Sequence, residues 1–300
     1  MKVKTSILLA VFLQLSLISF AQNTTYQVVT KTIEEVSNWQ PKQILEINGE
    51  NAIIHISTWA EDKVHATIEL IAKHPDKKVA EADIEVLQYS LTKQRKRIIL
   101  NNYLSINSKN PKPTSTLKTK FTLRIPVRCP LAIKNNFGSI HIEGIRQQIN
   151  VDSRFSKVSM EDVKGQLDLN SHFGEFRGTA LVGNINITSN RSNLFLNKVA
   201  GQVTMDAKYG KIEVVEDATY TYDLTVKGDK ADITILNPNT TLNQYALSTS
   251  FGNISTPPRS SFETLMDSDT LRQVQALTTT PQSKVTVSLN YGDISLRAER

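Results

Sequence analysis

The sequence is poor in cysteine: Cys129 is the only one in 300 residues. No disulfide can form within the chain, and we expect no lipid-modified cysteine at a processed N-terminus. Stability must therefore come from packing and hydrogen bonding. Cys129 precedes Pro130 at the end of an apolar strand, which favours a small buried hydrophobe. Pairing between two chains is the alternative that the sequence leaves open.

Aromatic residues make up only 7% of the chain, and its five histidines share no ligand spacing. A zinc site needs several such ligands to converge. Calcium-binding β-helix turns repeat glycine and aspartate in every turn, and that pattern is missing from this sequence. We therefore expect neither a metal nor another cofactor.

The chain carries little excess charge. It has 35 basic and 29 acidic residues, a difference of +6, and loss of Lys2 and Lys4 with a signal peptide would leave +4. The densest basic cluster, residues 93–97, lacks the interleaved aromatic residues that a nucleic-acid surface needs. We interpret it as a hairpin edge whose charges oppose aggregation, and we expect no nucleic-acid partner.

Long hydrophobic runs are absent beyond the N-terminus. Lys2 and Lys4 precede an apolar run over residues 7–20, which ends in Ser19-Phe20-Ala21. This pattern predicts a secretory signal peptide over residues 1–21, and the run is shorter than the roughly 20 apolar residues of a membrane span. We expect an exported chain without a transmembrane anchor, in the periplasm by default and at the cell surface or in the medium as the second choice.

Residues 22–130 form a predicted β-rich N-terminal region. Residues 44–47 and 52–56 are short strands on either side of an Asn/Gly turn. The strand pattern continues in residues 64–70, 97–100 and 121–125. Residues 78–88 predict one short helix.

Residues 131–300 are dominated by a repeat. Ile145, Val163, Leu181 and Val199 stand 18 residues apart. Each unit contains two short strands in which apolar and polar residues alternate, as in a half-buried strand. The apolar pairs form the expected core: Ile140 and Ile142, Ile149 and Val151, Val158 and Met160, Leu167 and Leu169, Ile185 and Ile187, Leu194 and Leu196, Val203 and Met205, Ile212 and Val214. Fixed self-similarity is typical of solenoids. We predict an all-β fold, a single-stranded β-solenoid similar to a parallel β-helix, with about 18–21 residues per repeat.

Aromatic residues, most of them followed by glycine, mark one corner of the predicted coils. Phe137, Phe155 and Phe173 keep the 18-residue step, which misses at Arg191 and resumes at Tyr209. Stacked coils would bring these rings into a broken ladder. The glycines that follow fit corners that need positive φ or a close approach of two backbones.

The repeat loosens towards the C-terminus. Past Val214 the period lengthens to 21, and the last copy of the motif begins at Tyr291, 40 residues after Phe251. Residues 256–283 form a polar excursion between these copies. The excursion either covers the open end of the solenoid or is an exposed functional loop.

Several of these features together resemble a known family. They are the exported N-terminal region with its Asn/Gly turn, the strand that ends at Pro126 and Pro130, coils of the type Phe137-Gly138-Ser139-Ile140, and the closing Tyr291-Gly292-Asp293-Ile294. The chain resembles the bacterial putative adhesin family of exported β-solenoid envelope proteins, which is related to the putative autotransporter adhesin head domain, over roughly residues 44–296. The resemblance implies an envelope location and an adhesin-like role, and it brings no catalytic residues with it.

Reactive side chains do not converge in the predicted coils. Asp152 and Asp206 would lie three coils apart, about 14 Å, which is too far for the carboxyl pair of a glycoside hydrolase. We predict a non-catalytic envelope protein that presents a rigid surface to a protein or a glycan. A polysaccharide-acting β-helix enzyme and a periplasmic regulatory or signalling partner are the alternatives.

Four residues mark the predicted interaction surface. The repeat fails at Arg191, and Phe195 is the one aromatic residue on an outward strand face. Arg177 and His141 belong to the same outward face as Phe195. We expect a partner to contact Phe195, Arg191, Arg177 and His141, because the other residues of the repeat are used in the core and at the corners.

Overall fold

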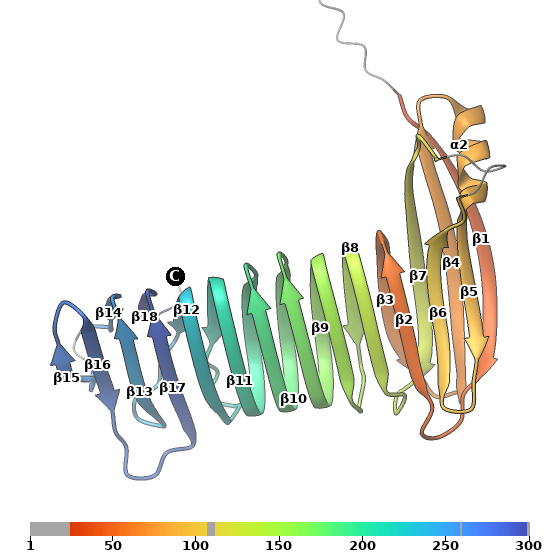
Figure 1. The fold of residues 1–300 in the computed structure, drawn as a ribbon. Coiled ribbons are helices and arrows are strands. Elements are labelled where there is room, and N and C mark those ends of the chain that lie inside the picture. The colour runs from red at the N-terminus through yellow and green to blue at the C-terminus, as the bar shows by residue number, and fades with distance from the viewer. Residues whose placement is uncertain (1–24, 107–111, 259, 299–300) are drawn as a thin grey trace, which may run out of the picture.

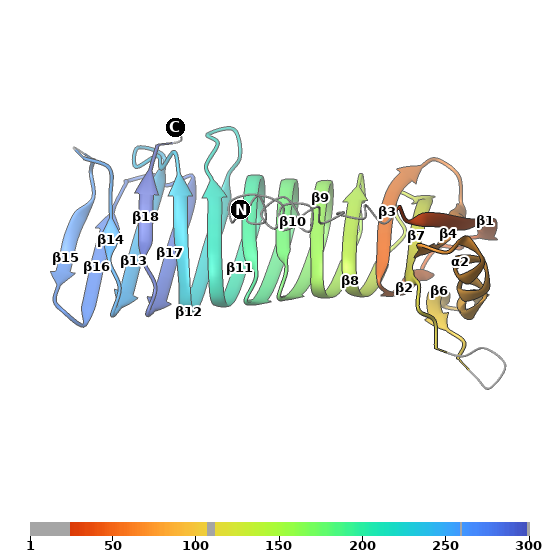
Figure 2. The ribbon, with the colours of Figure 1, turned by 90° about the horizontal axis from the view of Figure 1, so that it is seen from above.

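The chain folds into a straight stack of β-coils with a tall blade of longer strands at its N-terminal end. The computed structural model describes residues 25–106, 112–258 and 260–298, so the predicted signal peptide over residues 1–21 lies outside the described part. The stack and the blade together are L-shaped (Figure 1). Seen from above, the coils follow one another in a single row from the blade to the far end (Figure 2).

The central coils stack in parallel and in chain order. They comprise β8 (Leu131–Glu143), β9 (Ile149–His172), β10 (Glu175–Asn190), β11 (Asn193–Val215) and β12 (Tyr222–Leu236). Leu131 pairs with Ile149 and Leu167 with Ile185, both at the 18-residue offset. Between β11 and β12 the offset is 21, as in the pair Val203 and Leu224. The predicted all-β solenoid with repeats of 18–21 residues is confirmed.

The interior of the coils is apolar throughout. All of the apolar pairs predicted for the core are at most 2% exposed. Phe176 on β10 also has a fully buried ring. The alternation of inward and outward residues continues through β10 and places Phe176 in the core, two residues before Gly178. Cys129 is also fully buried, which agrees with the small buried hydrophobe that its position before Pro130 favours.

The solenoid begins before residue 131. Within the described residues, β2 (Ile44–Glu50) and β3 (Ala52–Trp59) do not pair with each other. Instead, β2 pairs in parallel with the first half of β8 and β3 with its second half. The two strands around the Asn/Gly turn are thus one more coil, with Asn51 at its corner (φ 51°). The solenoid therefore begins at β2 and not at the predicted boundary at residue 130. The sequence could not show this, because alternating strands of this length look the same in a hairpin and in a coil.

The blade continues both faces of the solenoid with longer, antiparallel strands. One layer contains β1 (Gln27–Asn38), β4 (Lys63–His74) and β7 (Thr116–Pro126), and β7 pairs in parallel with β3. The other layer contains β5 (Leu87–Lys93) and β6 (Arg97–Leu104), and β6 pairs in parallel with β2.

One short helix packs on the blade. α2 (Lys77–Asp83) begins after Asp76, whose side chain accepts a hydrogen bond from the Lys78 amide, and contacts β1 and β4. A single 3-10 turn, η2 (Ile84–Val86), follows and leads directly into β5. The helix is therefore shorter than the predicted residues 78–88, since the chain is already extended at Leu87.

The last coil is inserted out of chain order. β13 (Asn243–Ser250) and β14 (Ile254–Ser255) follow β12 in the sequence. In space, β17 (Ser283–Asn290) and β18 (Ile294–Arg297) lie between β12 on one side and β13 and β14 on the other (Figure 1). β17 pairs with both β12 and β13, and β18 pairs with both β12 and β14. The C-terminal segment therefore forms a coil of its own between β12 and the coil of β13 and β14.

The excursion over residues 256–283 covers the end of the stack. It contains the antiparallel strands β15 (Glu263–Asp267) and β16 (Leu271–Ala276), and β16 pairs with β13. The outermost strand, β15, is exposed along its whole length and has a register shift between Thr264 and Met266. Charged ends and irregular pairing discourage the addition of further strands, so the excursion acts as the cap that was one of its two predicted roles.

Candidate functional site: a ladder of corner side chains

One edge of the solenoid carries a continuous row of large side chains, which we call the corner ladder. All of its members have φ between 50° and 58°, and in order along the axis they are Phe137, Phe155, Phe173, Arg191, Tyr209, Lys230, Tyr291 and Phe251. Positive φ costs a residue with a side chain about 1 kcal/mol or more, and glycine or asparagine is the usual choice there. Large side chains at all of these corners indicate that the side chains offset a backbone cost.

The residue after each ladder position is small because the next coil lies very close. A Cβ atom on Gly174 would stand 2.3 Å from the carbonyl oxygen of Ser156. Gly174 does not itself have a positive φ. Two reasons for glycine at these corners were predicted: a close approach of two backbones, and a positive φ. The close approach applies at Gly174, whereas the residue with the positive φ is Phe173.

Neighbouring aromatic rings of the ladder are stacked. The ring centroids are 4.9 Å apart for Phe137 and Phe155 and for Phe155 and Phe173, with interplanar angles of 3° and 10°. Tyr291 and Phe251 stack in the same way at 4.9 Å. Such pairs contribute about 0.5–1.5 kcal/mol beyond the burial of their area.

Cations occupy the two ladder positions without a ring. The guanidinium carbon of Arg191 lies 5.4 Å from the ring centroid of Phe173 and 5.1 Å from that of Tyr209. Nζ of Lys230 lies 5.4 Å from the Tyr209 centroid and 5.9 Å from the Tyr291 centroid. These are cation–π distances. The ladder, predicted to break at Arg191, is continuous through it and extends to Phe251.

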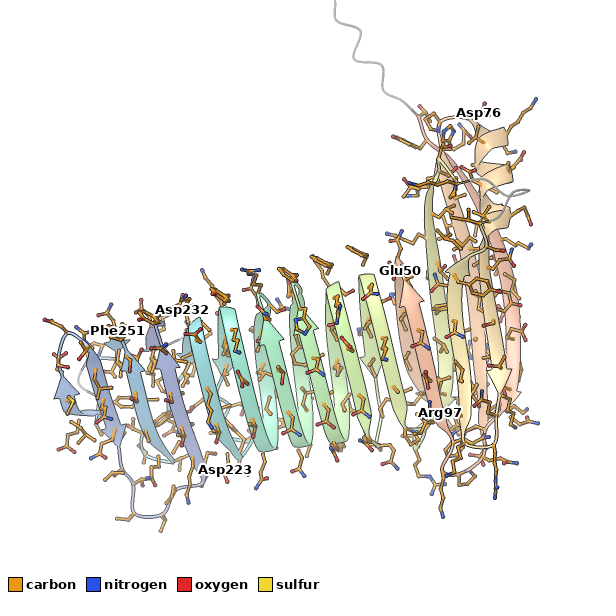
Figure 3. All side chains as sticks on the ribbon, in the orientation of Figure 1. Glu50, Asp76, Arg97, Asp223, Asp232 and Phe251 are labelled. Carbon is orange, nitrogen blue, oxygen red and sulfur yellow. The ribbon has the colours of Figure 1, made fainter. Side chains whose placement is uncertain are left out.

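The ladder is open to solvent along the edge. Its aromatic residues are between 39% and 54% exposed. Figure 3 shows a row of side chains along the upper edge of the coils, with Phe251 near its far end. The prediction for Phe195 concerned the strand faces, and the corners add further exposed rings to it, because a corner side chain points neither into the core nor along a strand face.

Basic residues flank the middle of the ladder. Exposed cations stand one residue before or two residues after ladder positions: Arg154, Lys157, Lys208 and Lys211. Within the described residues, none of these four, nor Arg191 or Lys230, lies within ion-pair distance of a carboxylate. The same flanking positions also hold the carboxylates of Glu175 and Asp229, so cations outnumber carboxylates along the middle of the edge without forming ion pairs to them.

The other three predicted site residues lie in one line on the adjacent strand face. Nδ1 of His141 is 2.9 Å from Oγ of Ser159, and Ser159 pairs with Arg177 on the next coil. Arg177 pairs in turn with Phe195, and its guanidinium carbon lies 4.4 Å from the centre of that ring. The structure thus brings His141, Arg177 and Phe195 together and places Arg191 apart from them, in the corner ladder.

The opposite strand face has a hollow of about 510 Å³ beside the blade, lined among others by Glu46, Arg97, Asp152 and Asp168. The two oxygens of Asp168 accept hydrogen bonds of 2.8 Å from the side-chain amides of Asn186 and Gln166. Asp206 pairs with Thr188, which pairs with Asn170, so Asp206 and Asp152 lie on coils three steps apart as predicted. Asp168 thus belongs to a ladder of polar side chains.

A buried carboxyl group, that of Glu216, connects the turns near the C-terminal end of the stack through hydrogen bonds. Glu216 is 7% exposed and accepts hydrogen bonds from the hydroxyls of Tyr222 and Tyr245 and from the side-chain amide of Asn243. Burial raises the pKa of Glu216, and these hydrogen bonds oppose the shift. Glu216 could not be identified from the sequence, because the turns around it follow no repeat.

The described residues contain no group of three or more His, Cys, Asp or Glu side chains that could hold a metal ion. In the same part of the chain, no helix combines the length and the apolar character that crossing a membrane requires.

Three solved structures resemble the chain over most of its length at low sequence identity. A "putative cell adhesion protein" from Clostridium sporogenes is 12% identical, with a TM-score of 0.25, over 90% of this chain and 100% of the other. A "putative adhesin" from Bacteroides fragilis is 12% identical, with a TM-score of 0.38, over 89% and 97%. A "putative lipid binding protein" from Parabacteroides distasonis is 11% identical, with a TM-score of 0.35, over 90% and 97%. At such TM-scores the ligands of these proteins say nothing about this chain.

The family comparison is more specific. No curated protein matches the chain. The Toastrack DUF4097 family matches residues 43–297, which run from the coil formed by β2 and β3 to the inserted coil of β18. The resemblance to adhesin-like β-solenoid proteins is confirmed at this level, and the chain belongs to the Toastrack DUF4097 family.

Proposed function

We propose that this protein is a non-catalytic, exported envelope protein that binds an extended glycan along the corner ladder. The observation that carries the proposal is the ladder itself: half-exposed rings and two cations on one straight edge, held at strained corners. A row of this kind offers the same type of contact at every coil, at intervals of about 4.8 Å, which suits a ligand that also repeats along its length.

The proposal differs from an adhesin that uses the strand face of His141, Arg177 and Phe195. On that face, Arg177 already lies against Phe195 and 3.6 Å from Glu175. A ligand would have to displace these contacts. The corner ladder offers more exposed aromatic surface, so we place the main contact there and the strand-face row at its border.

A pair of matched variants tests the proposal. Phe155→Asn/Phe173→Asn removes two central rings, and asparagine tolerates the positive φ of these corners. The control is Ala180→Asn, since Ala180 also has a positive φ (54°) but is not part of the ladder. Probes are dextran, polygalacturonate and its methyl ester, added to the chain without its signal peptide. Binding of at least one probe that is lost in the double variant and kept in the control supports the proposal. Equal binding by all three proteins, or no binding, contradicts it.

The proposed lack of catalytic activity is tested with the same protein and the same polymers. Incubation with polygalacturonate should release no reducing ends and no unsaturated products, because Asp152 and Asp206 lie three coils apart and Asp168 is held by hydrogen bonds from Asn186 and Gln166. Steady release that is abolished by Asp152→Ala or Asp168→Asn would favour the polysaccharide-acting enzyme.

For the compartment we propose the periplasm. Protease treatment of intact cells should leave the chain uncut, and cleavage only after the outer envelope is opened is the expected result. Cleavage on intact cells would place the ladder at the cell surface.

A further inference from the structure

The ring faces of the corner ladder are not available to a ligand. Each central ring lies about 5 Å from its neighbour on either side, or has a cation over its face. Sugar rings that bind by stacking need an open aromatic face. The part of the ladder that meets solvent is the ring edge, which is the positive end of the aromatic quadrupole. The ladder therefore favours oxygen atoms with negative charge over the apolar face of a neutral sugar.

The two cations of the ladder are arranged to bind such oxygens. Arg191 is sandwiched between Phe173 and Tyr209, and a guanidinium stacked in this way keeps its in-plane N–H groups free to donate. Lys230 stands two coils further along, about 10 Å at the usual strand spacing. Arg154 and Lys208 are exposed beside the same coils. Anionic groups of a ligand therefore meet donors at more than one step.

The charge of the edge changes sign along the axis. Asp232 lies on the same coil as Lys230, two residues after it, and Asp293 lies on the next coil; the carboxylates of both accept hydrogen bonds from backbone amides of the coil that follows. Those acids lie beside the far end of the ladder. Anion binding is therefore confined to the stretch between Phe155 and Lys230.

The shape of the molecule decides between a chain-like and a flat partner. The blade rises beyond the edge on which Phe251 and Asp232 lie, and Asp76 marks its tip (Figure 3). The ladder thus forms the inner edge of the L (Figure 1). A flat bilayer cannot lie along this edge without meeting the blade, whereas a slender polymer can.

The corner backbone also argues against a peptide that adds a strand. The amides of Phe173 and Arg191 donate to the carbonyls of Asn190 and Lys208 on the next coil. A peptide would find these two amides already paired, whereas strand addition depends on free main-chain partners.

We infer that the corner ladder selects acidic polysaccharides, with Arg191 and Lys230 as the positions that bind their carboxylate groups. The inference rests on the proposed function and names its ligand class. A linear glycan with regularly spaced carboxylates can present anionic groups to both cations, and the ring edges of Tyr209 and its neighbours lie between and beside them.

The test compares polygalacturonate with its methyl ester, which has the same backbone without the charge. The variant is Arg191→Asn/Lys230→Asn. The control is Lys198→Asn, because Lys198 is an exposed cation with the same positive φ (54°) outside the ladder. Circular dichroism and thermal melting establish that the variants are folded.

We expect polygalacturonate to bind at least tenfold more tightly than the ester, the double variant to lose at least tenfold, and the control to stay within twofold. Equal binding of both polymers that still depends on Phe155 and Phe173 would overturn this inference and leave the proposed function intact. Loss of that dependence would overturn both. Tighter binding of poly-glutamate, or of phosphatidylglycerol vesicles, than of polygalacturonate would overturn the assignment to a glycan.

Discussion

At the scale of single residues, the ladder corners combine an unfavourable backbone with a favourable side-chain contact. Phe155 has a φ of 50° and stacks on two rings at 4.9 Å. Replacement by asparagine loses both stacked pairs, about 2 kcal/mol together, and relieves a backbone strain of about 1 kcal/mol. We expect Phe155→Asn to lower the free energy of unfolding by about 1 kcal/mol.

Phe155→Val is the informative contrast. Valine loses the same stacking and, being β-branched, tolerates positive φ worst, so we expect a loss of about 2 kcal/mol or more in urea unfolding. Equal stability of the two variants would show that the corner is not strained.

Glu216 gives the far end a pH-dependent stability. Burial raises the pKa of this carboxyl in the folded state, so the folded chain holds the proton more tightly than the unfolded chain. Its contribution is fully present below the usual glutamate pKa of about 4.3 and is lost as the pH rises through the raised value. We expect Glu216→Gln to flatten the fall in unfolding free energy above about pH 4.

A second substitution at this residue separates charge from hydrogen bonding. Glu216→Ala leaves the hydroxyls of Tyr222 and Tyr245 without their acceptor, and we expect a loss of about 2–4 kcal/mol. An unchanged pH profile in Glu216→Gln would contradict the role of the carboxyl charge.

Cys129 is a packing residue with no thiol chemistry. Burial raises the pKa of its thiol to about 12, so the reactive thiolate is scarce at neutral pH. We expect maleimide to label the chain only as fast as it unfolds, with rapid labelling in urea. Fast labelling of the folded chain, or a disulfide-linked dimer, would show that the thiol is accessible.

Among the β-strands, the inserted coil of β17 and β18 stabilises the coils on both sides of it, although it is formed by the C-terminal segment. β17 separates β12 from β13 and pairs with both. A chain that ends after Gln282 lacks this coil, so we expect hydrogen exchange of β13 to become at least tenfold faster while β9 and β10 stay protected, since coils depend mainly on their neighbours.

Removal of the cap hairpin is the control for that truncation. Deletion of residues 263–276 takes away β15 and β16 but keeps the inserted coil. It should affect β13 at its outer edge only and leave β12 unchanged. Full protection of β13 in the truncated chain would mean that β13 can pair directly with β12.

The sequence predicts the coils well and their order less well. The 18-residue step sets the register of β8 to β11, because each apolar pair must lie above the previous one to remain buried. The coil of β2 and β3 and the inserted coil of β17 and β18 could not be assigned, since their alternating strands specify a buried face but not a neighbour. Long intervening segments, 40 residues between Phe251 and Tyr291, leave the partner open.

The candidate site was predictable in part for the same reason. The step of 18 identifies Phe137, Phe155 and Phe173 as a stack and Arg191 as a departure from it. That the Arg191 side chain lies between two rings is seen only in the folded structure. Phe251 and Tyr291 are recognisable in the sequence as copies of the corner motif, but their place in the ladder beside Lys230 is not, because the longer turns after Val214 shift all three off the 18-residue step.

At the scale of the whole molecule, the blade and the ladder act together. The stack supplies a straight edge with one contact per coil, and the blade closes that edge against flat partners. The proposed contact uses no enclosed pocket. The account therefore predicts a long, shallow contact whose strength grows with the length of the bound polymer, as expected when one ligand bridges several weak sites.

The most direct test maps where an acidic glycan touches the folded chain. Hydroxyl-radical oxidation of the aromatic residues can be followed by mass spectrometry with and without saturating polygalacturonate. Phe155, Phe173 and Tyr209 should be protected, while Tyr26 and Tyr103, which are 58% and 48% exposed on the blade, should be oxidised as before. Bound polymer that leaves the three ladder rings unprotected, or that protects the blade instead, would contradict the account.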